Sequence, residues 1–239
     1  MSTARGLAIV SGAGSGLGRE IALVLARRGH PLALLGRHLA PLQTVVTECS
    51  TLASAAAAAW MCDVREESSV ARAVEEAIAR FGPPEVVVPA AGTAHIAPLE
   101  STATADFDAV LETNLRGVFL LARACLPAMR ARERSWLIAV LSVAARRGFP
   151  GWSAYCASKW GLAGLLAALR EETAGSGVTI TGLYPGAVET PLWDALPGTW
   201  NRAAMIPASE LARAVDYVLD APPAAKIEEI LLSPSAGNQ

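Results

Sequence analysis

The length, composition and charge of the chain exclude several classes of protein. Its 239 residues, 52% of them hydrophobic, suffice for one large α/β domain with a full core, and no apolar segment approaches the ~18 residues of a transmembrane helix. The net charge is −2, acidic and basic residues are mixed along the chain, and the N-terminus carries no signal-peptide pattern, so we expect a cytoplasmic protein that binds neither nucleic acid nor membrane.

Short apolar runs alternate with longer amphipathic segments along the whole chain, which is typical of repeated βαβ units. We predict strands at residues 7–11, 31–35, 57–62, 85–89, 136–141, 178–183 and 227–232. We predict helices at residues 16–28, 40–52, 66–81, 105–132 (with a break near Asn114), 153–173 and 209–219. The nearly continuous apolar strands indicate a single domain with a doubly wound, seven-stranded parallel sheet flanked by helices, in which ligands bind beyond the carboxyl ends of the strands.

The first predicted strand runs into a glycine-rich turn that opens directly into a helix. Residues 11–18 read Ser-Gly-Ala-Gly-Ser-Gly-Leu-Gly. Glycines permit a tight turn and let a pyrophosphate approach the N–H groups at the positive end of a helix. In this position the turn predicts a dinucleotide-binding site.

The residues after the second and third strands bear on the identity of the dinucleotide. Gly36 stands where a carboxylate would bind the ribose hydroxyls of NAD, and Arg37 follows it. Because an arginine suits a 2′-phosphate, we expect NADP(H) rather than NAD(H), with a solvated loop arginine as the alternative. Asp63 either accepts a hydrogen bond from the adenine amino group or caps the next helix.

Tyr155 and Lys159 form a pair suited to proton transfer. They stand four apart in a predicted helix and therefore share one face, and Lys159 is one of only two lysines among 20 basic residues. A compact ammonium beside a phenol favours the phenolate and lowers the phenol pKa from its usual value of about 10. The pair predicts a phenol tuned towards proton transfer near neutrality.

Taken together, these positions resemble the short-chain dehydrogenase/reductase family of the Tyr-x-x-x-Lys type over essentially the whole chain. Residues 11–18 are similar to the family's Thr-Gly-x-x-x-Gly-x-Gly turn, with serine in place of threonine. Ser142, thirteen residues before Tyr155, matches its catalytic serine, and Asn114 matches its helix asparagine. Residues 185–190, Pro-Gly-Ala-Val-Glu-Thr, match the segment that contacts the nicotinamide.

The resemblance implies a Rossmann oxidoreductase in which Tyr155 exchanges the substrate proton while hydride moves to or from the nicotinamide. Lys159 would lower the tyrosine pKa and hold the nicotinamide ribose, Ser142 would hydrogen-bond the carbonyl oxygen, and Asn114 would fix a water linked to the lysine. The implied catalytic residues are Asn114, Ser142, Tyr155 and Lys159. The implied cofactor-binding residues are Gly12, Ser15, Gly16, Leu17, Gly18, Arg37, Asp63, Val64, Ala91, Gly92, Tyr155, Lys159, Pro185, Gly186, Val188 and Thr190.

The chain departs from the family pattern at two places. Where the family has Asn-Asn-Ala-Gly after the fourth strand, residues 89–92 read Pro-Ala-Ala-Gly, which lacks two side-chain amides and one backbone donor. We still expect Ala91 and Gly92 beside the cofactor, with altered rigidity and cofactor affinity. Ser15 stands where many NADPH-preferring members have a basic residue, so the expectation of NADP(H) rests on Arg37 and the missing acid before it.

Three tryptophans mark the predicted substrate side. Trp152 precedes the catalytic tyrosine, and Trp193 and Trp200 lie in residues 190–207, a segment rich in proline and glycine that we predict to be a short mobile lid. The tryptophans would suit a hydrophobic or aromatic ketone, and packing in the core or at a subunit interface is the alternative for each.

The leading hypothesis is an NADPH-dependent carbonyl reductase, reversible as an alcohol dehydrogenase. A 3-oxoacyl-thioester reductase is the enzyme alternative, because Arg146 and Arg147 could receive a carboxylate or the acidic surface of a carrier protein, although they could also be solvated. The alternative from another class is a non-catalytic dinucleotide-sensing protein, which the unusual residues 89–90 support.

The expected partners are a small-molecule ketone or alcohol and further copies of the chain. The resemblance implies a homodimer or homotetramer that pairs through the helix containing residues 160–169 and the helix before the fifth strand. The four cysteines lack metal-type spacing, so we expect free cysteines and no metal site.

Overall fold

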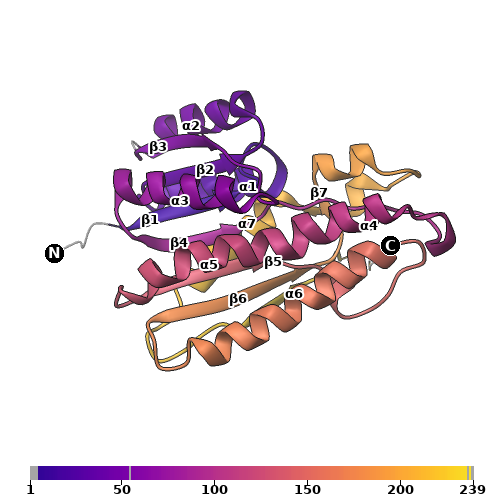
Figure 1. Ribbon diagram of the computed structural model, residues 1–239. Helices are drawn as coiled ribbons and strands as arrows, with labels where there is room; N and C mark the ends of the chain where they lie inside the picture. Colours follow the sequence, from indigo (N-terminus) through magenta and orange to yellow (C-terminus); the bar gives the residue numbers. More distant parts are fainter. Residues whose placement is uncertain (1–4, 54, 236, 238–239) are drawn as a thin grey trace.

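Seven parallel strands form one sheet at the centre of the molecule (Figure 1). The computed structural model describes residues 5–53, 55–235 and 237. The sheet strands are β1 (Leu7–Ser11), β2 (Leu32–Gly36), β3 (Ala57–Met61), β4 (Pro84–Pro89), β5 (Ser135–Val140), β6 (Val178–Pro185) and β9 (Glu229–Leu232). Their spatial order is β3-β2-β1-β4-β5-β6-β9, so the predicted doubly wound sheet is confirmed. The strand order reverses between β1 and β4, where doubly wound sheets bind ligands.

Helices cover both faces of the sheet. The first face is covered by α1 (Gly16–Arg27), α2 (Leu39–Ala53) and α7 (Ala208–Leu219). The second face, turned to the viewer in Figure 1, is covered by α3 (Glu67–Phe81), α5 (Gly117–Arg130) and α6 (Ser153–Glu172). Side chains alternate along each strand, so Ala8 and Val10 pack on the first face while Leu7 and Ile9 pack on the second. This explains why the predicted strands are apolar throughout.

The long helix before β5 contains an irregular turn. Here α4 (Thr104–Leu111) and α5 are joined by a π-helical segment, η2 (Glu112–Arg116), with Asn114 at its centre. The predicted break therefore takes the form of a widened turn inside a continuous helix. Such π-helical turns are frequent at functional sites.

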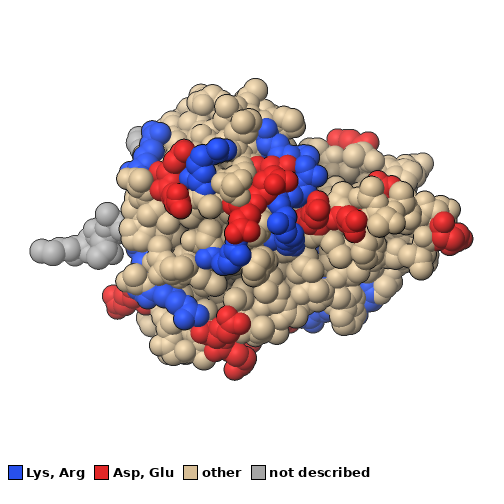
Figure 2. All heavy atoms as spheres, in the orientation of Figure 1, with Lys and Arg blue, Asp and Glu red and all other residues tan. Residues whose placement is uncertain are grey.

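Several short elements were too brief for sequence periodicity to reveal. They are the 3₁₀ turns η1 (Leu99–Ser101), η3 (Val143–Ala145), η4 (Pro191–Ala195) and η5 (Arg202–Ala204), and the short parallel pair β7 (Val188–Glu189) and β8 (Ile206–Pro207). Within residues 5–53, 55–235 and 237, no helix has the length and apolarity needed to cross a membrane. Acidic and basic side chains are interspersed over the face drawn in Figure 2.

Candidate active site

A cavity of about 650 Å³ lies at the carboxyl ends of the sheet strands. Residues that follow β1, β2 and β3 line one end, and residues that follow β5 and β6 line the other. Its volume falls within the range of roughly 300–1,000 Å³ that is usual for small-molecule and cofactor sites.

The glycine turn after β1 forms the floor of one end of the cavity. Gly12 has a φ of +67°, and a Cβ placed there would lie 2.7 Å from the backbone of Ala91. A Cβ at Gly18 would collide with the carbonyl oxygen of Gly12. Within the described part of the chain the Ser15 side chain makes no capping hydrogen bond, so the first-turn N–H groups of α1 have no side-chain cap. This cradle fits the diphosphate of a dinucleotide.

Ser11 ties the glycine turn to the segment that follows β4. Its buried hydroxyl accepts a 3.3 Å hydrogen bond from the N–H of Ala91. Pro89 ends β4 opposite Ser11, and β4 pairs with β5 only at Val86 and Val87. Residues 90–92 nevertheless line the cavity, as predicted. The Ser11 hydroxyl gives this segment an anchor that needs no side-chain amide from residues 89–90.

The end of the cavity nearest β2 and β3 carries two arginines. Arg37, predicted from the sequence, and Arg65, which sequence analysis missed, both line it. The guanidinium of Arg65 donates to both carboxylate oxygens of Asp63, with an Nη2–Oδ2 distance of 2.7 Å, and the Arg65 N–H adds a 3.0 Å bond. The Arg65 guanidinium, with a smaller contribution from Arg37, holds the pKa of Asp63 below its usual range.

Asp63 does not cap the next helix, and its hydrogen bond to the adenine amino group stays a prediction. Its carboxylate binds Arg65, while α3 begins after Glu66 without a side-chain cap among the described residues. The result is a cationic rim at this end of the cavity, with the negative charge of Asp63 already neutralised.

Tyr155, Ser142 and Lys159 meet at the opposite end. The Ser142 Oγ accepts a 3.1 Å hydrogen bond from the N–H of Ala144 and neighbours the Tyr155 hydroxyl, and the Lys159 Nζ lies 5.5 Å from the centre of the Tyr155 ring. Lys159 is only 5% exposed, and its Nζ donates a 2.9 Å hydrogen bond to the carbonyl oxygen of Val140. The structure thus brings these three predicted residues together around one hydroxyl.

The pKa values of this pair differ from the expectation drawn from the sequence. Burial raises the pKa of Tyr155 to about 12, and the neighbouring Ser142 side chain offsets only part of that rise. Burial also lowers the pKa of Lys159 to about 8. Burial is the largest effect on the tyrosine, so with the protein's own groups alone the phenol stays protonated at neutral pH.

Asn114 is buried and connects three parts of the site. Its Oδ1 accepts a 2.9 Å bond from the N–H of Thr93, and its Nδ2 donates to the Thr93 carbonyl at 2.8 Å and to the Ser158 hydroxyl at 3.1 Å. The Ser158 hydroxyl in turn donates to the Tyr155 carbonyl at 2.7 Å. Asn114 thereby fixes the turn that carries Tyr155 against the segment after β4.

The predicted nicotinamide segment closes over the glycine turn. Pro185, Gly186, Val188 and Thr190 all line the cavity. Gly16 has a φ of +51°, and a Cβ there would lie 3.4 Å from the Thr190 Cβ. Predicted residues Ser15, Leu17, Gly18 and Val64 also line the cavity.

The three tryptophans gather next to Tyr155 and line the cavity, together with Phe149, which sequence analysis missed. The Trp152 ring centre lies 5.4 Å from that of Tyr155, 6.0 Å from Trp193 and 6.3 Å from Trp200. Trp193 and Trp200 are 4.7 Å apart. Tyr155 and these aromatic side chains therefore line one part of the cavity.

Residues 190–207 cover this part of the cavity and are held by one arginine. The base of the segment is closed by β7 and β8, which pair Val188 with Ile206. Arg202 donates a 2.9 Å bond to the Thr190 carbonyl, forms a 2.7 Å ion pair with Asp194 and pairs with Glu189. The segment predicted to be a lid is thus held closed by the hydrogen bond and ion pairs of Arg202.

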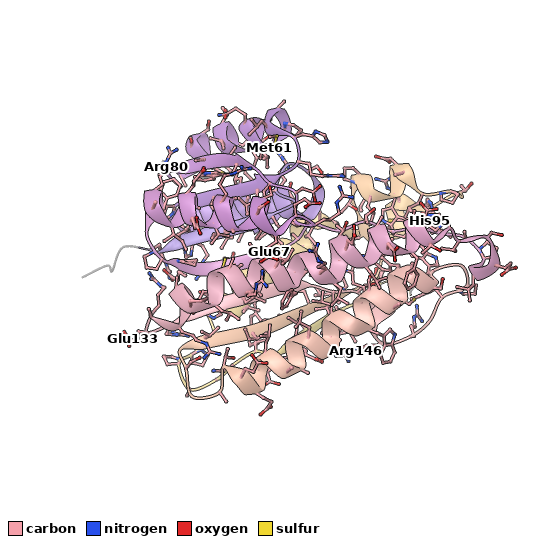
Figure 3. All side chains as sticks on the ribbon, viewed as in Figure 1. Met61, Glu67, Arg80, His95, Glu133 and Arg146 are labelled. Atoms are coloured by element: carbon pink, nitrogen blue, oxygen red, sulfur yellow. The ribbon has the colours of Figure 1, made fainter. Side chains whose placement is uncertain are left out.

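Arg146 and Arg147 do not reach the cavity. The Arg146 guanidinium lies 4.4 Å from the centre of the Tyr184 ring and pairs with Glu229, and Arg147 lies 4.6 Å from the ring centre of Phe149 (Figure 3 labels Arg146). Among the described residues that line the cavity, neither arginine appears. The pair gives no support to a carboxylate-binding role in the cavity.

Of the four cysteines, Cys62 lines the cavity, and burial raises the pKa of its thiol. Cys49, Cys62 and Cys125 are buried free thiols, and Cys156 is partly exposed. Within the ranges that the structure describes, no group of three or more His, Cys, Asp or Glu side chains is placed to hold a metal ion.

Comparison with known proteins explains the arrangement. Residues 6–199 match the family model described as short chain dehydrogenase. The chain belongs to the short-chain dehydrogenase family. It is accordingly an oxidoreductase built on a Rossmann sheet, as the glycine turn and the Tyr155–Lys159 pair predicted.

Relatives and solved structures agree with this assignment. A sepiapterin reductase from Chlorobaculum tepidum is 33% identical over 237 residues, covering 96% of this chain and 96% of the relative. A putative ketoacyl reductase of the monensin polyketide synthase from Streptomyces virginiae is 36% identical over 193 residues, covering 80% and 73%. An alcohol dehydrogenase from the archaeon Thermococcus sibiricus, solved in complex with 5-hydroxy-NADP, matches with a TM-score of 0.91 and 28% identity, covering 98% and 99%.

Proposed function

We propose that this short-chain dehydrogenase is an NADP(H)-dependent carbonyl reductase that interconverts hydrophobic ketones and secondary alcohols. The observation that carries the proposal is the grouping of Tyr155, Ser142 and Lys159: Ser142 neighbours the Tyr155 hydroxyl, and the Lys159 Nζ lies 5.5 Å from the centre of the Tyr155 ring. This group stands in the same cavity as the glycine turn and the arginine rim. The names of the relatives, which include reductases and an NADP-complexed alcohol dehydrogenase, support it.

The residues of the cavity fit NADP(H) along its whole length. The glycine turn would hold the diphosphate at the N-terminus of α1, and Arg37 and Arg65 would receive the 2′-phosphate. Lys159 would hold the nicotinamide ribose, with residues 185–190 beside the ring. When bound, the cofactor supplies or accepts the hydride at the carbonyl carbon.

The protein's own side chains would donate the proton and stabilise the charges that develop during its transfer. Ser142 would hydrogen-bond the substrate oxygen as negative charge develops on it, and Tyr155 would donate the proton that completes the alcohol. Lys159, whose pKa of about 8 leaves it mostly protonated at neutral pH, would stabilise the phenolate that remains. Asn114 positions Tyr155 through Ser158.

Two other functions are separable from this one. Reduction of a 3-oxoacyl thioester is favoured by the name of the Streptomyces virginiae relative, but the positions of Arg146 and Arg147 do not favour it. A dinucleotide-sensing protein without chemistry would fit the fold, yet it would have no use for a serine beside the buried Tyr155 hydroxyl.

One assay with the purified protein tests the proposal. NADPH oxidation, with NADH in parallel, is followed over a panel of ketones that includes a free 3-oxo ester and its carrier-bound thioester. We expect ketone turnover with NADPH, and Tyr155→Phe should lose about 10²–10⁴-fold of it while still binding NADPH. Tight NADPH binding without turnover of any ketone or alcohol would favour the sensor, and turnover of the carrier-bound thioester alone would favour the thioester reductase.

We further propose that copies of the chain pair through α5 and α6. The side chains of Phe119 on α5 and Trp160 on α6 are 42% and 54% exposed, which is high for large apolar groups. Light scattering coupled to size exclusion should report a dimer or tetramer, and Trp160→Glu should shift it towards the monomer. A monomer at micromolar concentration would contradict the pairing. A cytoplasmic location remains our expectation for this enzyme.

A further inference from the structure

Ser142 begins the 3₁₀ turn η3, and its own atoms hold that turn together. The Ser142 Oγ accepts a 3.1 Å hydrogen bond from the N–H of Ala144, and its carbonyl oxygen accepts a 3.0 Å bond from the N–H of Ala145. One acceptor position of the Oγ is therefore occupied, while the hydroxyl proton stays available for another acceptor. The orientation of η3 thus sets the direction in which Ser142 can donate.

Arg146 ends this turn and binds it to two strands of the sheet. Its N–H donates a 2.9 Å hydrogen bond to the carbonyl oxygen of Val143. Its guanidinium carbon lies 4.4 Å from the centre of the Tyr184 ring on β6, and its Nη2 forms an ion pair with Glu229 on β9. The residue that follows η3 is therefore held by β6 and β9 together.

The two partners of Arg146 are themselves held in place. Tyr184 is 2% exposed, and its hydroxyl donates a 2.9 Å hydrogen bond to Oε1 of Glu229. Burial and this carboxylate raise the pKa of Tyr184, so its hydroxyl remains a donor. Arg170 on α6 lies 3.6 Å from the same oxygen, and it donates to the carbonyl oxygens of Ile180 and Glu228. One carboxylate therefore binds groups from β6, from α6 and from the residue after η3.

This network is stronger than an isolated surface ion pair. The side chains of Arg146 and Glu229 are 45% and 39% exposed, and a pair with this exposure contributes little by itself. Here the guanidinium also lies over the ring of the buried Tyr184, which restricts its position and adds a cation–π contact. A lysine would not reproduce the contact, because it lacks the planar fork of an arginine.

The strands that Arg146 contacts lead to the cofactor side of the cavity. Tyr184 directly precedes Pro185, which ends β6 and lines the cavity. β9 is bound to the next residue by a 2.7 Å hydrogen bond from the N–H of Gly186 to the carbonyl oxygen of Leu232. Arg146 is not among the described residues that line the cavity, yet it connects η3 with the segment predicted to lie beside the nicotinamide.

We propose that Arg146 is a positioning residue for carbonyl reduction. By binding Tyr184 and Glu229 it fixes η3, and it thereby fixes the Ser142 hydroxyl relative to the cofactor and the substrate oxygen. The inference rests on the proposed carbonyl reductase function, and it adds to that function a residue outside the cavity.

The test measures the chemical step with and without the Ser142 hydroxyl. NADPH oxidation is followed in single turnovers with excess enzyme, using the ketone of the panel that the wild type reduces fastest. Arg146→Met should lower this rate by about tenfold, which is less than the ~10²-fold that a 1 Å misplacement can cost. In Ser142→Ala the positioned hydroxyl is absent, so the further change Arg146→Met should lower the rate by less than about twofold. The Kd for NADPH should stay near the wild-type value in both backgrounds.

Further variants assign the effect to the network. Glu229→Gln should slow the reaction less than Arg146→Met, because the amide oxygen still accepts the Tyr184 hydroxyl, and the double variant should be no slower than Arg146→Met. Arg146→Lys should be closer to Arg146→Met than to the wild type. The matched control is Arg134→Met, since the Arg134 guanidinium lies 4.9 Å from the centre of the Trp136 ring at the other end of β5. It should leave the rate unchanged.

The failures are distinguishable. If the wild type reduces no ketone with NADPH, the proposed function itself fails. If the wild type is active but Arg146→Met is equally fast, or if Arg146→Met slows both backgrounds by the same factor, the carbonyl reductase stands and the positioning role of Arg146 is overturned. Circular dichroism checks the fold of each variant. Should Arg146→Met not fold, Glu229→Gln is compared in the same two backgrounds, and an equal effect in both would overturn the proposal.

Discussion

The Nζ of Lys159 lies 5.5 Å from the centre of the Tyr155 ring, and the pKa values of the two groups are displaced in opposite directions. Burial raises that of Tyr155 to about 12 and lowers that of Lys159 to about 8. Burial disfavours the charged form of each group, so the tyrosine is poised as a proton donor. The lysine is then the group of the pair whose charge changes within the working range of pH.

The first prediction concerns the pH dependence of ketone reduction. Above pH 8 Lys159 loses its proton and can no longer stabilise the Tyr155 phenolate, so kcat/KM should fall as pH rises through about 8. The measurement is kcat/KM from pH 6 to 10 at saturating NADPH. In Lys159→Arg the rate should be lower throughout and the descending limb should move beyond pH 10, because a guanidinium keeps its proton. A limb that stays near pH 8 in this variant would assign the titration to another group.

The same pair shows how far sequence can reach. The apolar runs, the glycine turn and the spacing of Tyr155 and Lys159 are local patterns, and together they were sufficient to predict the sheet and the family. The pKa of Tyr155 could not be predicted, because burial depends on segments distant in the chain, such as the lid that carries Trp193 and Trp200. The sequence showed that a lysine lies near the phenol, but it did not show that burial would raise the pKa of Tyr155.

The sequence also could not show which charged side chains form ion pairs, even where the two residues are close along the chain. Arg65 stands two residues after Asp63, yet nothing in the sequence distinguishes an arginine that forms an ion pair with this aspartate from an arginine in solvent. Arg202 reaches back to Glu189 because β7 and β8 bring the two ends of the lid together. Two-residue strands of this kind have no periodicity to detect.

A second prediction concerns Asn114 as a structural link. Asn114→Ala removes three hydrogen bonds and leaves the Thr93 backbone groups unpaired, which should lower the free energy of unfolding by ~1–3 kcal/mol or more. Urea unfolding followed by tryptophan fluorescence measures it. Ser158→Ala removes two hydrogen bonds but keeps both bonds of Asn114 to Thr93, so it should cost less. A change within about 0.5 kcal/mol for Asn114→Ala would show that these bonds contribute little, since that is the range of ordinary surface substitutions.

A third prediction concerns discrimination between NADPH and NADH. Arg37→Gln and Arg65→Gln should each lower the ratio of kcat/KM for NADPH to that for NADH by roughly 10- to 100-fold, because hydrogen bonds to charged groups contribute about 1.5–3 kcal/mol. Arg65→Gln also frees the Asp63 carboxylate, whose charge would repel a 2′-phosphate. The double variant Arg65→Gln/Asp63→Asn should therefore recover part of the ratio.

The control for this series is Arg80→Gln on α3, whose guanidinium lies 5.1 Å from the centre of the Phe81 ring and is not among the described residues that line the cavity. It should leave the cofactor ratio unchanged. If Arg65→Gln behaves like this control, Arg65 serves only to hold Asp63. If the double variant is no better than Arg65→Gln, the freed carboxylate has no influence on the phosphate.

The last prediction concerns Arg202 and the lid. Arg202→Gln breaks the contacts to Glu189, Asp194 and the Thr190 carbonyl, so residues 190–207 should open more often. Because Trp193 and Trp200 lie in this segment and line the cavity, KM for the ketone should rise several-fold, while KM for NADPH changes less. Chymotrypsin should cut within 190–207 faster in the variant, as mass spectrometry of the fragments would show.

The salt dependence of KM distinguishes a lid held by the Arg202 ion pairs from a lid held only by packing. The two carboxylates that pair with Arg202 are exposed, so added salt should screen these ion pairs and raise the wild-type KM for the ketone. In Arg202→Gln the KM for the ketone should not depend on salt. The control is Arg213→Gln, which breaks an ion pair with Glu210 on α7 and should leave both KM and its salt dependence unchanged. Equal KM values and equal cleavage rates in wild type and Arg202→Gln would mean that the tryptophan contacts alone keep the lid closed.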